Sequence, residues 1–97
     1  IYFQLGKYYY QTKKFNKSIE FFDKVDQYDL SDDDQNEFLF KLGYSNFMKN
    51  NQIEAKVLFS ELLQKQTNYE VPATYYFSHI AYEEGKYQTA LEGFKKI

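Results

Sequence analysis

A repeated arrangement of small and large residues constrains this chain more than any other feature. The dipeptides Leu5-Gly6, Leu42-Gly43 and Phe77-Ser78 are separated by 37 and 35 residues. Each is followed at matching distances by a small, an aromatic and an aliphatic residue. These are Ser18, Phe22 and Val25 in the first copy, Ala55, Phe59 and Leu62 in the second, and Ala90, Phe94 and Ile97 in the third. A period of this length is typical of a chain built from stacked supersecondary units.

The spacing within each copy predicts two antiparallel helices. Large residues recur at helical intervals, and the small residues allow the two helices to approach closely, as Gly6 would against Ser18. First helices are predicted at about 1–12, 33–49 and 72–84, and second helices at about 15–28, 52–66 and 87–97.

Residues typical of helix ends and turns support these boundaries. Ser31 and Asp34 form a Ser-x-x-Asp capping box at the start of the third helix. Asn50-Asn51 and Gly85-Lys86 are predicted turns, because Asn and Gly tolerate left-handed backbone. Pro72 is expected in a first helical turn, with Val71 extended before it.

The segment 81–91, Ala-Tyr-Glu-Glu-Gly-Lys-Tyr-Gln-Thr-Ala-Leu, closely resembles the turn region of a tetratricopeptide repeat. The resemblance covers the whole chain and favours a piece of a larger bacterial repeat protein. It implies one all-α domain over 1–97, a right-handed superhelical stack of three helix-turn-helix repeats at about 1–32, 36–70 and 71–97. The chain departs from the family where Leu30 and Thr67 replace the closing proline and where Asn46 occupies a normally bulky position.

The family resemblance also implies a concave groove, formed mainly by the first helix of each repeat. The groove positions in this sequence are Phe3, Lys7, Tyr10, Phe40, Tyr44, Phe47, Met48, Tyr75, His79 and Tyr82. Most are aromatic, so the groove is expected to expose rings that bind apolar anchors of a peptide. The alternative is that these rings pack between repeats. Of the positions used by the family's carboxylate clamp for chaperone C-termini, only Lys7 carries a suitable cation, so that clamp is not expected.

Composition argues against several other functions. Twelve Lys, no Arg and a net charge of −2 disfavour a nucleic-acid surface. No Cys is present, and no apolar run is long enough to span a membrane. His79 has no second His or paired carboxylates with which to form a catalytic or metal site. The Asp32-Asp33-Asp34 run lacks the ligand spacing of a calcium loop. Neither an enzyme, a cofactor nor a metal is expected.

The expected function is therefore that of a scaffold that binds a peptide or protein segment. The alternative is a self-association or spacer element of a longer array. Phe94 and Ile97 in the incomplete last repeat are expected to leave apolar surface uncovered, which would favour homo-association. The compartment stays open, although the resemblance to bacterial arrays favours a parent protein of the cell envelope or periplasm.

Overall fold

The computed structural model describes all 97 residues and is entirely helical. It contains six α-helices, one short 3-10 helix and no strand. The α-helices are α1 (Tyr2–Gln11), α2 (Phe15–Phe22), α3 (Asp32–Met48), α4 (Gln52–Leu63), α5 (Glu70–Glu83) and α6 (Tyr87–Lys95), and the 3-10 helix η1 (Gln27–Asp29) lies between α2 and α3. The predicted all-α class is confirmed.

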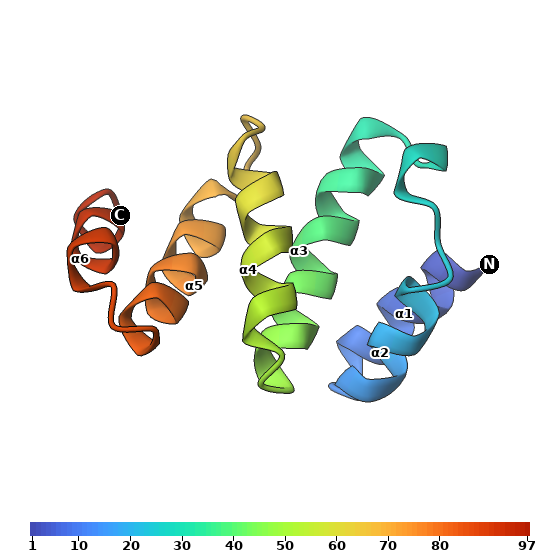
Figure 1. Cartoon of the computed structure of the whole chain (residues 1–97). Helices are drawn as coiled ribbons and strands as arrows, with labels where there is room; N and C mark the ends of the chain where they lie inside the picture. Colours follow the sequence, from blue (N-terminus) through green and yellow to red (C-terminus); the bar gives the residue numbers. More distant parts are fainter.

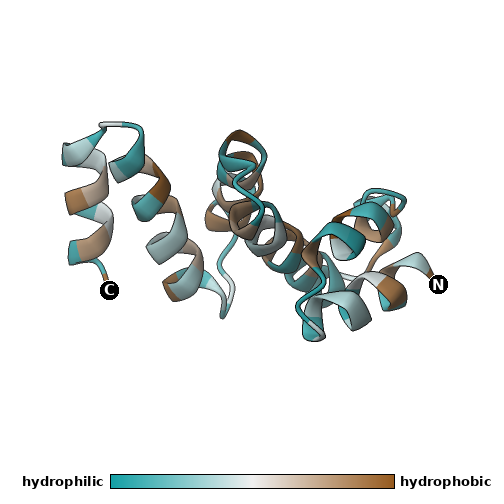
Figure 2. Cartoon of the chain, turned by 90° about the horizontal axis from the view of Figure 1, so that it is seen from below, coloured by the Kyte–Doolittle hydropathy of each residue, from teal (hydrophilic) through white to brown (hydrophobic).

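The helices form three hairpins that follow one another in chain order (Figure 1). Each helix packs against the next one along the chain, and α3 also contacts both α1 and α5. The hairpins remain distinct when the molecule is seen from below, with the two termini at opposite ends of the row (Figure 2). The molecule is accordingly elongated, measuring 41 × 26 × 19 Å along its principal axes.

The turns inside the three hairpins share one geometry. Lys13, Asn50 and Gly85 adopt left-handed φ values of 62°, 63° and 82°. In each case the amide of the following residue donates a hydrogen bond to a carbonyl five residues earlier, over N···O distances of 2.8–2.9 Å. The Asn50 and Gly85 turns follow the prediction. The left-handed Lys13 was not predicted, because lysine has no preference for that conformation.

The first two hairpins are tight because a phenylalanine ring lies against a glycine. A Cβ atom added to Gly6 would lie 2.5 Å from the Phe22 ring, and one added to Gly43 would lie 2.9 Å from the Phe59 ring. The glycines therefore make room for aromatic rings, which was not predicted. The predicted contact between Gly6 and Ser18 is present as well, since the Ser18 hydroxyl donates a 2.9 Å hydrogen bond to the Gly6 carbonyl.

In the third hairpin the two helices also approach closely, but the glycine lies on the second helix instead of the first. Ser78 occupies the position of Gly6 and Gly43, and Gly93 on α6 lies opposite it. A Cβ on Gly93 would overlap the Ser78 hydroxyl. The Ser78 Oγ is buried without a hydrogen-bond partner. Space at this crossing is therefore provided by the second helix instead of the first.

One continuous core runs through the three hairpins. At the first junction, the rings of Phe22 and Phe38 meet edge to face with their centroids 5.5 Å apart. The core comprises Phe3, Phe22, Phe38, Leu39, Leu42, Ala55, Phe59, Leu62, Ala73 and Ile80. Burial of these apolar side chains supplies the main stabilisation of the stack.

Several helix boundaries differ from the prediction. Helix α2 ends at Phe22 instead of about residue 28, because the Asp26 carboxylate accepts a hydrogen bond from the Tyr28 amide and begins η1. Helix α5 starts at Glu70, so the prediction that Val71 is extended is wrong. Pro72 is tolerated there because the first helical N–H groups have no partner within the helix. The Ser31 cap is confirmed, with its hydroxyl accepting from the Asp34 amide at 3.2 Å.

Candidate functional site

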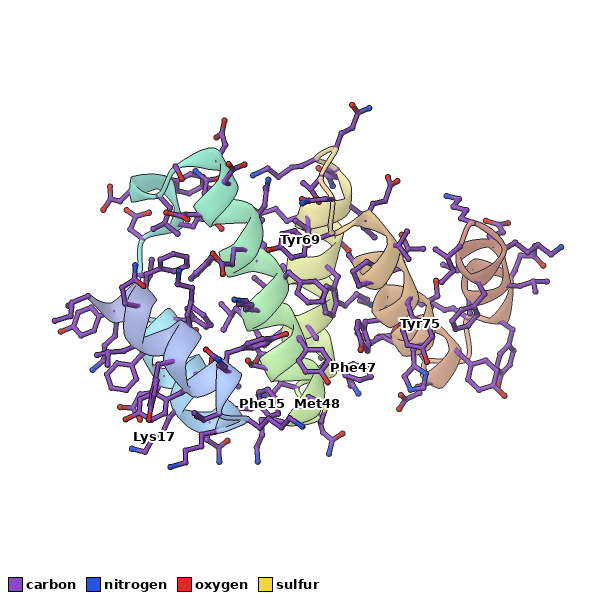
Figure 3. All side chains as sticks on the ribbon, turned by 180° about the vertical axis from the view of Figure 1, so that it is seen from behind. Phe15, Lys17, Phe47, Met48, Tyr69 and Tyr75 are labelled. Carbon is purple, nitrogen blue, oxygen red and sulfur yellow. The ribbon has the colours of Figure 1, made fainter.

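An aromatic surface lies on the side of the molecule formed by the first helix of each hairpin. Figure 3 views this side, with α1 and α3 in front of their hairpin partners. Phe47 lies near α5, and its ring is 5.0 Å from that of Tyr76 and 5.5 Å from that of His79. We define the aromatic face as Tyr10, Phe15, Phe40, Tyr44, Phe47, Met48, Tyr69, Tyr75, Tyr76 and His79.

A pocket of about 540 Å³ opens in the aromatic face. The first hairpin contributes Tyr10 and Phe15 to its wall, the second Phe40 and Tyr44, and the third Tyr76. The complete lining is Tyr10, Gln11, Lys13, Phe15, Phe40, Tyr44, Met48, Pro72 and Tyr76. Segments far apart in the sequence therefore build one cavity.

Tyr44 is the central ring of this pocket. Its ring meets those of Tyr10, Phe15 and Tyr76 edge to face, with centroids 5.9, 5.7 and 5.2 Å away. It also stacks on Phe40 at 6.3 Å. Edge-to-face and offset contacts of this kind are the favourable arrangements for aromatic pairs. The ring positions are therefore fixed by mutual contact before any ligand arrives.

Three charged side chains, Lys7, Glu37 and Lys41, lie close together beside the Tyr10 ring. Glu37 bridges two lysines, with carboxylate oxygens 3.6 Å from Lys7 Nζ and 2.6 Å from Lys41 Nζ. Lys41 Nζ also lies 5.2 Å from the centroid of the Tyr10 ring, a cation-π contact. The predicted groove residue Lys7 is thus already paired within the chain.

Burial holds three tyrosine hydroxyls of the aromatic face, those of Tyr10, Tyr69 and Tyr76, in their protonated form. Burial, followed by the nearby Tyr44 and Tyr76, raises the pKa of Tyr10 to about 12. Burial also raises the pKa values of Tyr69 and Tyr76. These phenols remain hydrogen-bond donors at any physiological pH.

Four of the predicted groove residues come together in the pocket: Tyr10, Phe40, Tyr44 and Met48. Met48 and Tyr75 are each 46% exposed. Phe40 and Tyr44 are half-buried and pack against the core. The expectation that both rings are largely exposed is therefore wrong. The physical reason is that Tyr76 from α5 covers part of both rings.

Phe3 and Tyr82 were predicted to line the groove, but neither lines the pocket of the aromatic face. Phe3 is buried, and its ring lies 6.1 Å from Phe22 within the core, so it cannot line an open groove. Tyr82 is exposed but lines another pocket, with Tyr87, Leu91 and Phe94. His79 lies at the edge of the aromatic face, where its Nε2 is 2.8 Å from Glu83 Oε1.

The sequence did not predict Phe15 and Tyr76 as pocket residues. Phe15 opens a second helix, and groove residues were sought mainly on first helices. Tyr76 follows Tyr75 in α5. Its contacts with Tyr44 and Phe47 of α3 depend on how the second and third hairpins pack together. The high density of tyrosine in residues 69–76 was the available signal.

No group of three or more His, Asp or Glu side chains is placed to hold a metal ion. None of the helices combines the length and apolar character that crossing a membrane demands.

Comparison of the chain with protein-family models, with curated proteins and with solved structures gives no significant match.

Proposed function

We propose that this chain is a tetratricopeptide-like interaction module that binds a peptide or protein segment in the pocket of the aromatic face. The observation that carries the proposal is that all three hairpins contribute side chains to that one pocket. The repeated turn geometry and the repeated contact between glycine and phenylalanine support the likeness to the repeat family. A right-handed superhelical stack is part of the same proposal.

The chemistry of the pocket favours an apolar anchor on a peptide backbone. Its volume of about 540 Å³ lies within the roughly 300–1,000 Å³ usual for ligand sites. Six aromatic or aliphatic side chains form the wall, namely Tyr10, Phe15, Phe40, Tyr44, Met48 and Tyr76, beside Pro72. Tyrosine hydroxyls, Gln11 and Lys13 can donate hydrogen bonds to backbone carbonyls of the bound segment.

The proposed role is recognition rather than catalysis. The pocket lining contains no His, Asp, Glu, Ser or Cys, which are common general acids, bases and nucleophiles. Tyr and Lys can serve in the same roles, but burial keeps the phenols of Tyr10 and Tyr76 protonated, so they are donors and not bases. Rigid rings and polar donors instead suit recognition.

Selection of phage-displayed random peptides on the immobilised chain tests the proposal. We expect enriched peptides to carry aromatic or aliphatic anchors and to perturb the NMR signals of the pocket residues. Truncation of Tyr44 to Ala should weaken binding by about 2 kcal/mol or more, as expected for a central aromatic anchor. Because Tyr44 is half-buried, calorimetry of the same variant must show that it is folded at the assay temperature.

Met48→Ala provides a second variant with less effect on folding, because Met48 is among the more exposed pocket residues. Val57→Ala is the matched control, since Val57 is exposed on α4 and lies outside the pocket. Selected peptides that bind both folded pocket variants as tightly as the parent would place the binding site elsewhere.

A further inference from the structure

Lysines gather along one long edge of the molecule, and acidic residues gather along the opposite edge. The turns of the first two hairpins lie at one edge, and the loop between α2 and α3 lies at the other (Figure 1). Residues 11–17 contain three Lys and no acidic residue, and Lys49 is the C-cap of α3 at the second turn. Residues 26–37 contain five Asp, one Glu and no Lys. The charges of the first two hairpins are therefore separated across the aromatic face.

The pocket of the aromatic face lies at the lysine edge. Figure 3 places Phe15, Met48 and Lys17 toward this edge and Tyr69 toward the opposite one. Phe15 and Met48 line the pocket, and so does Lys13, which is the one charged residue of the lining. The wall of the pocket therefore presents a cation and no carboxylate to a bound segment.

The charge of Lys13 is not neutralised within the chain. The two lysines near the Tyr10 ring, Lys7 and Lys41, both pair with Glu37, at 3.6 and 2.6 Å. Lys56 and Lys86 pair with Glu84. Lys13 takes part in none of the ion pairs of the molecule. Its ammonium group is therefore available to a ligand of the pocket.

The backbone conformation at Lys13 is one that lysine does not favour. Its φ of 62° is left-handed, and the equivalent residues of the other two turns are Asn50 and Gly85. Asn and Gly adopt this conformation at lower cost than a residue with a long side chain. Lysine at this turn therefore costs stability relative to Asn, and what it adds is a cation beside the pocket. Residues held in unfavourable backbone conformations cluster at functional sites.

We propose that Lys13 makes the pocket selective for acidic segments, in which an aromatic or aliphatic anchor lies next to an Asp or Glu residue. This selectivity rests on the proposed function, since a segment must first occupy the pocket. The anchor fills the space among Tyr10, Phe15 and Tyr44, and the acidic side chain pairs with Lys13 at the rim. Because all three hairpins line the pocket, the segment crosses it, and the carboxylate at the rim belongs to a side chain.

The neighbouring lysines favour the same kind of partner. Lys14 adjoins Lys13 in the first turn, and Lys49 follows the pocket residue Met48. Their summed potential attracts acidic segments to this edge and repels basic ones. Lys13 then distinguishes among acidic segments by contact, because it alone of these lysines lines the pocket.

NMR titration of the isotope-labelled chain with short synthetic peptides tests the selectivity. Each peptide is blocked at both ends and carries one Phe among Gly and Ser residues, with Asp, Asn or Lys next to the Phe. Binding of the Asn peptide to the pocket tests the proposed function alone. The Asp peptide should bind about two- to fivefold more tightly than the Asn peptide, as expected for a solvent-exposed ion pair. This advantage should shrink as salt is added, and the Lys peptide should bind most weakly.

Two neighbouring lysines provide a matched pair of variants. Lys13→Asn removes the charge and gives the first turn the residue type of Asn50, so the fold is expected to be retained. Lys14→Asn removes a charge from the adjacent position, which corresponds to Asn51 and lies outside the pocket lining. Lys13→Asn should bind the Asp and Asn peptides equally, whereas Lys14→Asn should keep the preference of the parent. Lys13→Glu should reverse the preference in favour of the Lys peptide.

The possible failures of the selectivity and of the proposed function are distinct. Equal binding of the Asp and Asn peptides to the parent would overturn the selectivity and leave the proposed function standing. An advantage of Asp that persists in Lys13→Asn, or that is lost equally in Lys14→Asn, would show that contact with Lys13 is not its source. A gain seen only when the C-terminus of the Asn peptide is left free would overturn the assignment to a side-chain carboxylate. Failure of every Phe peptide to bind would disprove the proposed function and the selectivity together.

Discussion

Phe59 and Phe94 occupy equivalent positions in the second and third hairpins but have different surroundings. Phe59 is fully buried, whereas Phe94 is 36% exposed. Phe59 lies between Phe40 of its own hairpin and Tyr76 of the next, with centroids 5.9 Å away in both cases. Phe94 has a ring contact with Tyr75 of its own hairpin, at 5.9 Å, and no following hairpin covers it.

The comparison separates two contributions to a repeat position. The sequence pattern within one hairpin places an aromatic ring on the second helix. The following hairpin decides whether that ring is part of the core or part of the surface. The same residue type at the same repeat position can therefore contribute very different amounts to folding stability in successive hairpins.

Truncation of the two rings should give the largest difference between the hairpins. Phe59→Ala removes a fully buried ring and is expected to lower the free energy of unfolding by about 3–5 kcal/mol. Phe94→Ala should cost about 1 kcal/mol or less, because the Phe94 ring is 36% exposed. Urea denaturation followed by circular dichroism measures both. Equal losses of unfolding free energy would show that the following hairpin does not determine how much the aromatic ring contributes to stability.

Enlarging the small residues of the same two hairpins should give an intermediate effect. Ala55 and Ala90 are both buried, at 0% and 1% exposure. Ala55→Leu overpacks a site enclosed by core residues and should cost about 1–3 kcal/mol. Ala90→Leu should cost less, because its neighbours Tyr87, Leu91 and Phe94 face solvent and can move.

Lys17→Leu is the control for this pair, since Lys17 is exposed on α2 and its replacement should be nearly neutral. Thermal unfolding midpoints of the three variants and the parent provide the measurement. A midpoint for Ala55→Leu equal to that of the parent would contradict the alignment of the repeats.

The smallest effect is expected for the ion pair that joins the two hairpins. Lys56 Nζ of α4 lies 3.0 Å from Glu84 Oε2 at the end of α5. Its hydrogen bond lowers the pKa of the Glu84 carboxyl below the ordinary 4.5. Because the folded pKa is lowered, the stabilisation is present above the ordinary pKa and is lost as the pH falls through the folded value.

Glu84→Gln should therefore be slightly less stable than the parent at neutral pH and equal to it in acid. Urea midpoints measured from neutral pH to below pH 4.5 test this convergence. Gln64→Glu is a suitable comparison, because it alters charge at the C-cap of α4, the helix of Lys56, without touching the pair. A difference between Glu84→Gln and the parent that persists unchanged into acid would show that the ion pair does not account for it.

The helix pairing was predictable because it depends on local pattern. Apolar spacing within a helix and turn residues such as Asn50 and Gly85 act over a few residues. The end of α2 was not predictable in the same way, because the Asp26 carboxylate accepts from the Tyr28 amide and so begins a competing turn. Helical periodicity alone did not reveal that interruption.

The aromatic face was only partly predictable. Periodicity identifies the side of the helix on which Tyr44 lies, but it does not tell how far the next hairpin covers that side. The cover comes from Tyr76, whose position depends on the packing of α5 against α4. Phe3 was assigned to the groove by family resemblance, whereas its ring lies beside Phe22 in the core.

The exchange of Ser78 and Gly93 in the third hairpin constrains the order in which its sequence can change. Acquiring a side chain at Gly93 first would drive that group into the Ser78 hydroxyl. Changing Ser78 to Gly first removes a buried hydroxyl that has no hydrogen-bond partner and opens the space. A residue larger than glycine can then be accepted at 93, as Leu58 is at the equivalent position of α4. The two substitutions that would give the third hairpin the pattern of the first two are therefore tolerated in one order only, with Ser78 changed before Gly93.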